Sequence, residues 1–255
     1  TGRVGACDAL CAPGHYCEEG SKGSSLVKSN HIKGHWKLDD KTGTVAAESS
    51  GAFSAGTLLG EAVFFVDGII AGVDFTGGYV DVPDLSFGSA TEISFSIWVQ
   101  YRTFRSWSRV FDFGNGQDSD NILLANEGSS QNAGFHVRVG STNEGVDVTN
   151  FWTENDECTD TFCHVGATIS VSKKQFKLYR NGNLKGTKTH SRSNHPNLAM
   201  TRTSNFLGKS NWADSWFDGK LKDFRIYTIK LSAEDVVLIP EDSRANVCPA
   251  GTFRL

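Results

Sequence analysis

Four tryptophans and three arginines of this sequence lie between its stretches of regular alternation. They are Trp107, Trp152, Trp212 and Trp216, with Arg102, Arg105 and Arg109 around the first of them. An indole offers a flat apolar surface that matches the apolar face of a sugar ring, and an arginine could meet an acidic or sulfated glycan. We therefore expect a ligand site at Arg105, Trp107, Trp212 and Trp216. The alternative is that each tryptophan anchors a loop beneath the fold and that the arginines form a scattered, solvated set.

A second candidate site is the polar stretch from Asn115 to Asn121. It places Asp118 and Asp120 close together among Gly, Ser and Asn residues. Closely spaced hard oxygens in a loop suit Ca²⁺, so we expect Asp118 and Asp120, with backbone carbonyls, to hold calcium in a stabilising role. The alternative is a solvated turn rich in Asp and Asn.

Six cysteines carry the third kind of chemistry: Cys7, Cys11, Cys17, Cys158, Cys163 and Cys248. No pair has the Cys-x-x-Cys spacing of a zinc ribbon, which favours structural disulfides in an oxidising compartment. Cys158 and Cys163 flank a short polar turn and are expected to bond each other. If no thiol is free, one of the three N-terminal cysteines must then bond Cys248.

Composition narrows the class of protein that holds these residues. The 255 residues include 27 Gly and 1 Met, a bias that suits many strands joined by tight turns. The net charge is −4 with both signs interspersed, which excludes the basic stripe of a nucleic-acid-binding protein. The longest apolar run, Ala62 to Val73, is interrupted at Asp67 and Gly68, so no membrane span is expected. The start at Thr1 suggests a mature or excised fragment.

The chain divides into three parts by composition. Residues 1–25 are rich in Cys, Gly and Ser without periodicity and predict a small disulfide-rich appendage. Cys11 to Cys17 and Cys248 to Phe253 share the pattern Cys-x-x-Gly-x-aromatic, so residues 241–255 are interpreted as the start of a second Cys-rich module. Residues 26–240 between them form the main domain.

The main domain has the alternation of β-strands. Apolar and polar residues alternate from Ile93 to Tyr101, from Phe135 to Val139 and from Val165 to Val171, which is the two-residue period of a strand with one buried face. Asn181-Gly182 suits the tight turn of a hairpin. Trp36 and Trp98 lie within strands and are expected to pack in or against the core.

One helix is predicted, near the end of the main domain. Ser232 to Asp235 has the form of a capping box, and apolar residues follow it as far as Ile239. Pro240 is expected to end the helix there.

The order of several segments resembles the LamG-like jelly rolls of the concanavalin A-like lectin superfamily. The segments are His35–Asp39 with Glu48–Gly51, Val73–Pro83, Ile93–Tyr101, Cys163–Thr168 with Leu178–Gly182, and Phe217–Tyr227 with Leu231–Glu234. Cys163 stands where the family usually has Trp, and Lys222 stands where an acidic residue is common. The flanking Cys-rich pieces are similar to ephrin-receptor-like modules.

The resemblance implies an all-β protein, a two-sheet antiparallel jelly-roll sandwich with small disulfide-rich terminal appendages. Hydrolases with this sandwich place carboxylates at alternate positions of one strand. Here Glu154, Asp156 and Glu157 lie in a polar loop instead, so we expect no enzyme activity. The leading hypothesis is an extracellular recognition module that binds a glycan or a protein partner. The alternatives are a building block of an extracellular filament or coat, and a targeting module attached to a distant enzyme.

Overall fold

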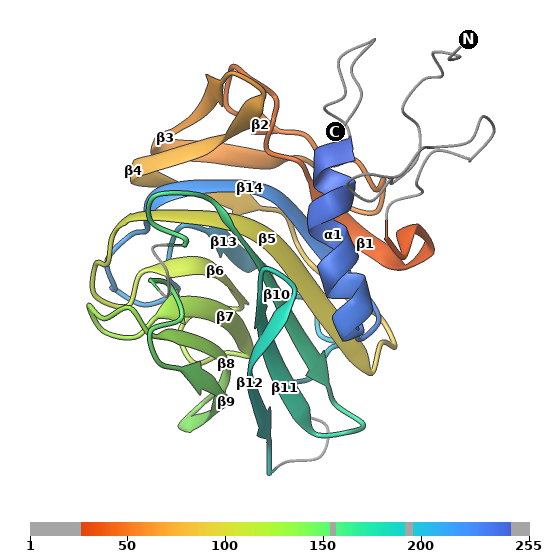
Figure 1. The fold of residues 1–255 in the computed structure, drawn as a ribbon. Helices are drawn as coiled ribbons and strands as arrows, with labels where there is room; N and C mark the ends of the chain where they lie inside the picture. Colours follow the sequence, from red (N-terminus) through yellow and green to blue (C-terminus); the bar gives the residue numbers. More distant parts are fainter. Residues whose placement is uncertain (1–26, 154–156, 192–195, 246–255) are drawn as a thin grey trace, which may run out of the picture.

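The structure, a computed structural model, describes residues 27–153, 157–191 and 196–245 (Figure 1). Antiparallel strands dominate these residues. The elements are a 3₁₀ helix (η1, Ser29–His31), the strands β1 (Ile32–Trp36), β2 (Val45–Ala46), β3 (Gly56–Asp67), β4 (Ile70–Val82), β5 (Glu92–Thr103), β6 (Arg109–Gly114), β7 (Asn121–Asn126), β8 (Ala133–Val139), β9 (Thr142–Val148), β10 (Cys163–Ser170), β11 (Gln175–Arg180), β12 (Asn183–Thr189), β13 (Ser204–Leu207) and β14 (Asp218–Tyr227), and the helix α1 (Ala233–Ala245).

The strands form two layers that are linked through one long strand. Hydrogen bonding follows the order β12-β11-β10-β5-β14-β4-β13-β6-β7-β8-β9. The first part of β4 pairs with β14 around Val73, whereas its last part pairs with β13 around Val80. β4 therefore passes from one layer to the other. The predicted all-β, two-sheet antiparallel jelly-roll sandwich is confirmed.

The crossing of β4 depends on glycine. The register of β3 against β4 shifts between Gly60 and Ala62, opposite Gly78. A Cβ atom on Gly78 would lie 2.2 Å from the Ala62 nitrogen and 2.3 Å from the Leu59 oxygen. These distances leave no room for any side chain, so the sharp bend of the hairpin requires Gly at this position.

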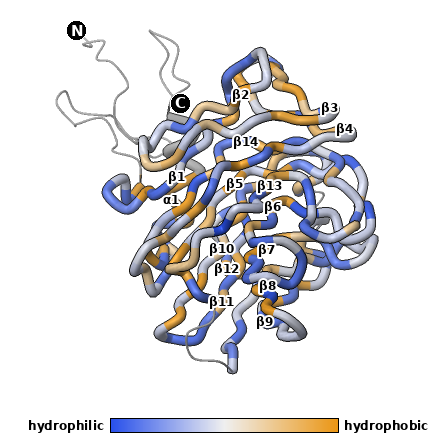
Figure 2. The backbone as a smooth tube through the Cα atoms, turned by 180° about the vertical axis from the view of Figure 1, so that it is seen from behind, coloured by the Kyte–Doolittle hydropathy of each residue, from blue (hydrophilic) through white to orange (hydrophobic). Residues whose placement is uncertain are grey.

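Phenylalanines fill the space between the layers. Phe95 of β5 has its ring centroid 4.9 Å from that of Phe111 in β6, and Phe135 of β8 lies 6.0 Å from Phe176 of β11. Apolar and polar residues are interleaved along the strands (Figure 2), as the predicted alternation requires. Trp36 is fully buried and Trp98 is 6% exposed, which confirms their expected packing roles.

Helix α1 covers the outer face of the layer that contains β10 and β11. Ser232 Oγ accepts a hydrogen bond from the Asp235 nitrogen, and the Asp235 carboxylate accepts one from the Ser232 nitrogen. The predicted capping box is thus confirmed. The predicted end at Pro240 is wrong, because the helix continues to Ala245. A proline inside a helix removes one hydrogen bond and crowds a carbonyl of the preceding turn, at a cost of about 3 kcal/mol. Val236 and Ile239 pack into a small second core, and this burial offsets the cost.

Two local predictions are confirmed. Cys158 and Cys163 form a disulfide. Asn181 and Gly182 both have positive φ and join β11 to β12 in a two-residue turn. Cys7, Cys11, Cys17 and Cys248, and the Cys-rich modules predicted around them, lie outside the described residues. Among the helices that the structure describes, none is long and apolar enough to cross a membrane.

Candidate functional site

The outward face of β6 to β9 carries polar side chains in adjacent rows. In β8, Phe135 and Val137 belong to the core, so His136 and Arg138 between them point outward. His136 pairs in register with Leu123 of β7, and Arg138 pairs with Asn143 of β9. Residues in register share a face of the sheet. The face therefore presents an imidazole, a guanidinium and an amide side by side.

A hollow of ≈ 200 Å³ lies on this face. Its lining combines strand residues with two loop segments: Trp107, Arg109, His136, Arg138, Trp212 and Asp214, together with Leu123 and Asn143. Pockets that enclose a small molecule typically measure about 300–1,000 Å³. The smaller hollow suits a ligand that lies across the surface.

Arg109 joins the two tryptophans of the hollow. Its guanidinium carbon is 5.8 Å from the Trp107 ring centroid and 5.5 Å from that of Trp212. The same guanidinium donates to the Trp107 carbonyl at 2.6 Å and to the Asp214 carboxylate at 2.8 Å. Burial lowers the pKa of Arg109, but Asp112 and Asp214 oppose this effect. Arg109 is therefore a fixed, buried cation that orients both indoles.

A buried carboxylate holds the loop that carries Trp212. Asp112 of β6 is fully buried and accepts hydrogen bonds from the Asn211 nitrogen at 2.9 Å and the Asn211 Nδ2 at 3.0 Å. Asn121 donates to it as well. Burial raises the pKa of Asp112, while these donors favour its charged form. The segment between β13 and β14 is thereby fixed onto the outer face of the sheet.

Trp107 is held in an unusual backbone conformation. Its φ is 52°, in the left-handed region that costs a bulky residue about 1–2 kcal/mol. The Trp107 nitrogen donates to the Gly128 carbonyl at 2.7 Å, and the Asn126 side chain donates to the same carbonyl at 2.7 Å. Such strain often marks a functional position. Here the strained backbone places the Trp107 indole at the edge of the hollow, where the residue is 38% exposed.

The structure brings together two of the four residues predicted to bind a ligand. Trp107 and Trp212 line the hollow, whereas Arg105 and Trp216 do not. Arg105 pairs with Asp218 at 3.0 Å, and Trp216 packs edge-on against Tyr79 with 5.7 Å between ring centroids. Ligand binding by these four residues stays a prediction.

The other aromatic and basic candidates have structural partners. Trp152 is fully buried beside Tyr101, with 4.8 Å between the ring centroids, so it is the loop anchor that the alternative interpretation describes. Arg102 pairs with Asp74 at 2.7 Å and with Asp218 at 2.6 Å. Arg102, Arg105 and Arg109 all form ion pairs; the first two side chains remain 42% and 43% exposed, whereas Arg109 is buried.

The stretch predicted to bind calcium is a tight turn between β6 and β7. Asp118 and Asp120 both have positive φ. An Asp118 carboxylate oxygen lies 3.3 Å from the Arg138 guanidinium, and the Asp120 carbonyl accepts a hydrogen bond from Arg202 at 3.0 Å. Several of the oxygens expected to meet calcium thus have protein partners. Calcium binding at Asp118 and Asp120 stays a prediction.

Sequence reasoning did not identify four polar residues of the hollow as candidates. They are His136, Arg138, Asn143 and Asp214. The alternation of β8 does indicate that His136 and Arg138 face away from the core. Nothing local in the sequence indicates that a segment about seventy-five residues later, around Trp212 and Asp214, folds onto the same face.

A family model described as the concanavalin A-like lectin/glucanases superfamily matches residues 74–237. This match covers more than half of the chain. The chain belongs to this superfamily. No curated protein sequence matches it significantly.

Several solved structures have a similar fold at low sequence identity. Domain 4 of AbnA, a GH43 extracellular arabinanase from Geobacillus stearothermophilus solved with arabinotriose, is 21% identical with a TM-score of 0.63, covering 82% of this chain and 98% of that chain. The CBM40 of the Ruminococcus gnavus IT-sialidase, bound to α2,3-sialyllactose, is 16% identical with a TM-score of 0.50, covering 59% and 82%.

A toxin structure gives a third likeness. It comes from a study of botulinum neurotoxin type C, whose cell entry depends on interaction with two ganglioside molecules. It is 13% identical with a TM-score of 0.60, covering 84% of this chain and 52% of that chain. At these identities the likenesses show the fold, and they show that solved glycan-binding proteins share it.

Proposed function

We propose that this domain is a non-catalytic, extracellular recognition module that binds a glycan at the hollow between Trp107 and Trp212. One observation carries the proposal. Two indoles from separate loops, fixed by the same buried Arg109, meet over polar side chains of β8 and β9. Fixed aromatic anchors of this kind keep the entropic cost of binding low.

The chemistry of the lining matches a sugar. The indoles offer flat apolar area for a ring face, and Arg138, Asn143 and Asp214 offer donors and acceptors for hydroxyl groups. The Arg138 side chain is 34% exposed, and the Asp118 carboxylate that pairs with its guanidinium lies 3.3 Å away. A glycan with a carboxylate or sulfate group would bind more tightly by forming a charge-assisted hydrogen bond with this guanidinium.

Two further findings support the proposal. Similar structures include proteins with bound arabinotriose and sialyllactose. The Cys158–Cys163 disulfide favours an oxidising, extracellular setting. A structural building block without a soluble ligand is the competing function, and the experiment below distinguishes the two.

The test begins with a glycan array, followed by titration calorimetry on the best ligand. We expect Trp107→Ala and Trp212→Ala each to weaken binding by about thirtyfold, the equivalent of roughly 2 kcal/mol for one interface anchor. The melting temperature of each variant reports whether the fold is kept.

Trp216→Ala is the matched control. Trp216 is 37% exposed, almost the same as the 38% of Trp107, but it lies outside the hollow. The control should bind within about threefold of the parent. A parent that binds no glycan on the array, or equal losses in all three variants, would contradict a glycan site at this hollow.

A further inference from the structure

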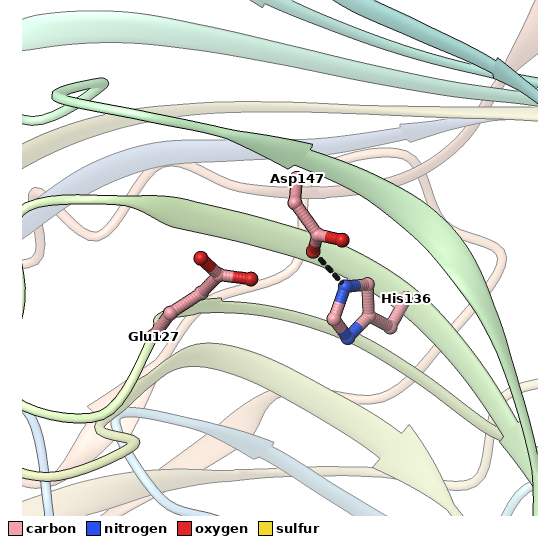
Figure 3. A group of neighbouring side chains, drawn as sticks. All are labelled: Glu127, His136 and Asp147. Carbon is pink, nitrogen blue, oxygen red and sulfur yellow. Dashed lines mark hydrogen bonds and ion pairs between the residues drawn. The ribbon is translucent and has the colours of Figure 1, made fainter.

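Three potential metal ligands meet at one edge of the same outer face (Figure 3). Glu127 directly follows β7, His136 lies in β8 and Asp147 lies in β9. One ligand atom from each side chain lies within 4.8 Å of the other two. His136 Nε2 is hydrogen-bonded to an Asp147 carboxylate oxygen, and the Glu127 carboxylate turns toward the same point (Figure 3).

We propose that Glu127, His136 and Asp147 bind a zinc ion. One imidazole nitrogen and two carboxylate oxygens form a donor set that zinc accepts, and three protein ligands leave a fourth position for water or another ligand. The proposal goes beyond glycan binding and stands whether or not the hollow holds a sugar.

The strand position next to the cluster carries no side chain. Gly134 lies in register with Asp147 on the adjacent strand. A Cβ atom there would stand 3.1 Å from His136 Nε2 and 3.4 Å from Asp147 Oδ1, the two atoms that would coordinate the metal. Any larger residue would fill part of this space. The glycine thus keeps a side chain from crowding one side of the hydrogen-bonded His136 and Asp147 atoms, where an ion would have to approach.

The charges of the cluster favour a cation. The Glu127 and Asp147 carboxylates each place an oxygen within 4.8 Å of the other and of a His136 ring nitrogen. Two carboxylates this close disfavour each other's charge. A divalent ion would neutralise both and replace the proton between His136 and Asp147.

Zinc fits this set better than calcium. Calcium takes six to eight oxygen ligands, while the cluster offers three side chains, one of them an imidazole. Ligand atoms of a four-coordinate zinc ion at about 2 Å stand roughly 3.3 Å apart. The hydrogen-bonded His136 and Asp147 atoms must therefore separate slightly, and the Glu127 carboxylate must approach them. The partly exposed Glu127 side chain can supply that movement by rotating about its own bonds.

Calorimetry of untagged, chelator-treated protein with zinc chloride tests the site. We expect one zinc ion per chain and a melting temperature that rises with zinc concentration by mass action. Glu127→Gln, His136→Asn and Asp147→Asn should each weaken zinc binding by at least about tenfold. Glu127→Gln keeps the size of a partly exposed side chain, so it tests the site even if a variant of the more buried His136 fails to fold.

Glu144→Gln is the matched control. Glu144 also faces a buried histidine, His190, at 3.5 Å, but this pair has no third metal-ligating side chain among the residues that the structure describes. The control should bind zinc like the parent protein. The proposal is overturned if the parent binds no zinc at micromolar concentration, or if binding persists unchanged in Glu127→Gln and Asp147→Asn.

Discussion

At the scale of single residues, buried charge is placed with its partners across large sequence separations. Asp223 shows this outside the candidate site. Its φ is 51°, and the register of β14 against β5 shifts between Lys222 and Arg225. This irregularity turns the carboxylate toward His35 Nε2 at 2.8 Å and toward the Arg225 guanidinium, also at 2.8 Å. The side chain closes a charged cluster between β1 and β14.

Asp223→Asn tests the energetic role of this cluster. Burial alone would raise the pKa of Asp223, but His35 and Arg225 outweigh it and hold the pKa well below the usual range. The carboxylate therefore stabilises the fold above the unfolded-state pKa of about 3.9, and this contribution is lost as the pH falls further. At pH 7 the free energy of unfolding of the variant should be about 3 kcal/mol lower than that of the parent, which is the cost of breaking a buried ion pair.

Urea unfolding at pH 7 and at pH 3 measures this prediction. The difference in unfolding free energy between Asp223→Asn and the parent should narrow at pH 3. At that pH the unfolded parent takes up a proton at this carboxyl, whose unfolded-state pKa is about 3.9, while the folded parent still holds the charge. Asp67→Asn, at an exposed aspartate of the β3–β4 hairpin, should change stability little at either pH. A difference that stays constant across pH would show that size or packing, and not charge, is responsible.

At the scale of elements, glycines decide where strands bend and how closely they approach. Gly78→Ala should lower the free energy of unfolding by about 3 kcal/mol or more, because the added methyl group would meet backbone atoms of β3 at 2.2 and 2.3 Å. Chemical denaturation measures the loss. Gly128→Ala is the control: nothing lies within 4 Å of its Cβ position, and its φ of 56° costs a residue with a side chain about 1–2 kcal/mol. Equal losses in both variants would contradict the steric argument.

Short sequence patterns predicted where strands and the helix begin, whereas features that depend on tertiary packing were not predicted. The alternation from Ile93 to Tyr101 lies within β5, and the capping box at Ser232 starts α1. Both of these features are determined by residues close together in the sequence. The position where α1 ends is not, because it depends on the packing of Val236 and Ile239 against residues of other strands. This packing lets the helix pass Pro240.

The candidate site was predictable only in part for the same reason. Trp152 and Trp212 both lie in polar loops, yet Trp152 is fully buried and Trp212 stands at the hollow. The difference arises from partners more than a hundred residues apart along the chain, such as Arg109 for Trp212. The Glu127, His136 and Asp147 cluster likewise needs three neighbouring strands in register, which no short motif shows.

At the scale of the whole molecule, the first and last described segments lie side by side. Val27 and Ile32 pack against the small core formed by Val236 and Ile239 of α1. Lys28 pairs with Asp235 at 3.4 Å. The fold therefore brings the beginning and the end of the domain together. The pairing of β1 with β14, the first and last strands along the chain, has the same effect.

This arrangement supports a disulfide between the terminal regions. Cys7, Cys11, Cys17 and Cys248 lie outside the described residues, and the prediction is that one of the first three bonds Cys248. An extended chain covers about 3.3–3.6 Å per residue, so the ten residues before Val27 give Cys17 a long reach. A bond from one of these cysteines to Cys248 would close a loop that contains nearly the whole chain. Closing so long a loop should stabilise the domain by about 5 kcal/mol on the chain-entropy model.

Peptide mapping under non-reducing conditions identifies the partner of Cys248, and Cys248→Ser measures its contribution to stability. The variant should melt at a lower temperature than the parent in the absence of reductant. Under full reduction the two should melt together, since the parent then loses the terminal bond that the variant lacks, and both lose the short Cys158–Cys163 bond. That short bond closes a small loop and contributes about 2 kcal/mol by the same reasoning, so most of the effect of reductant should come from the terminal bond. A map in which Cys248 is free, or bonded to a second chain, would show that the packing of Val27 against α1 holds the ends together without a covalent link.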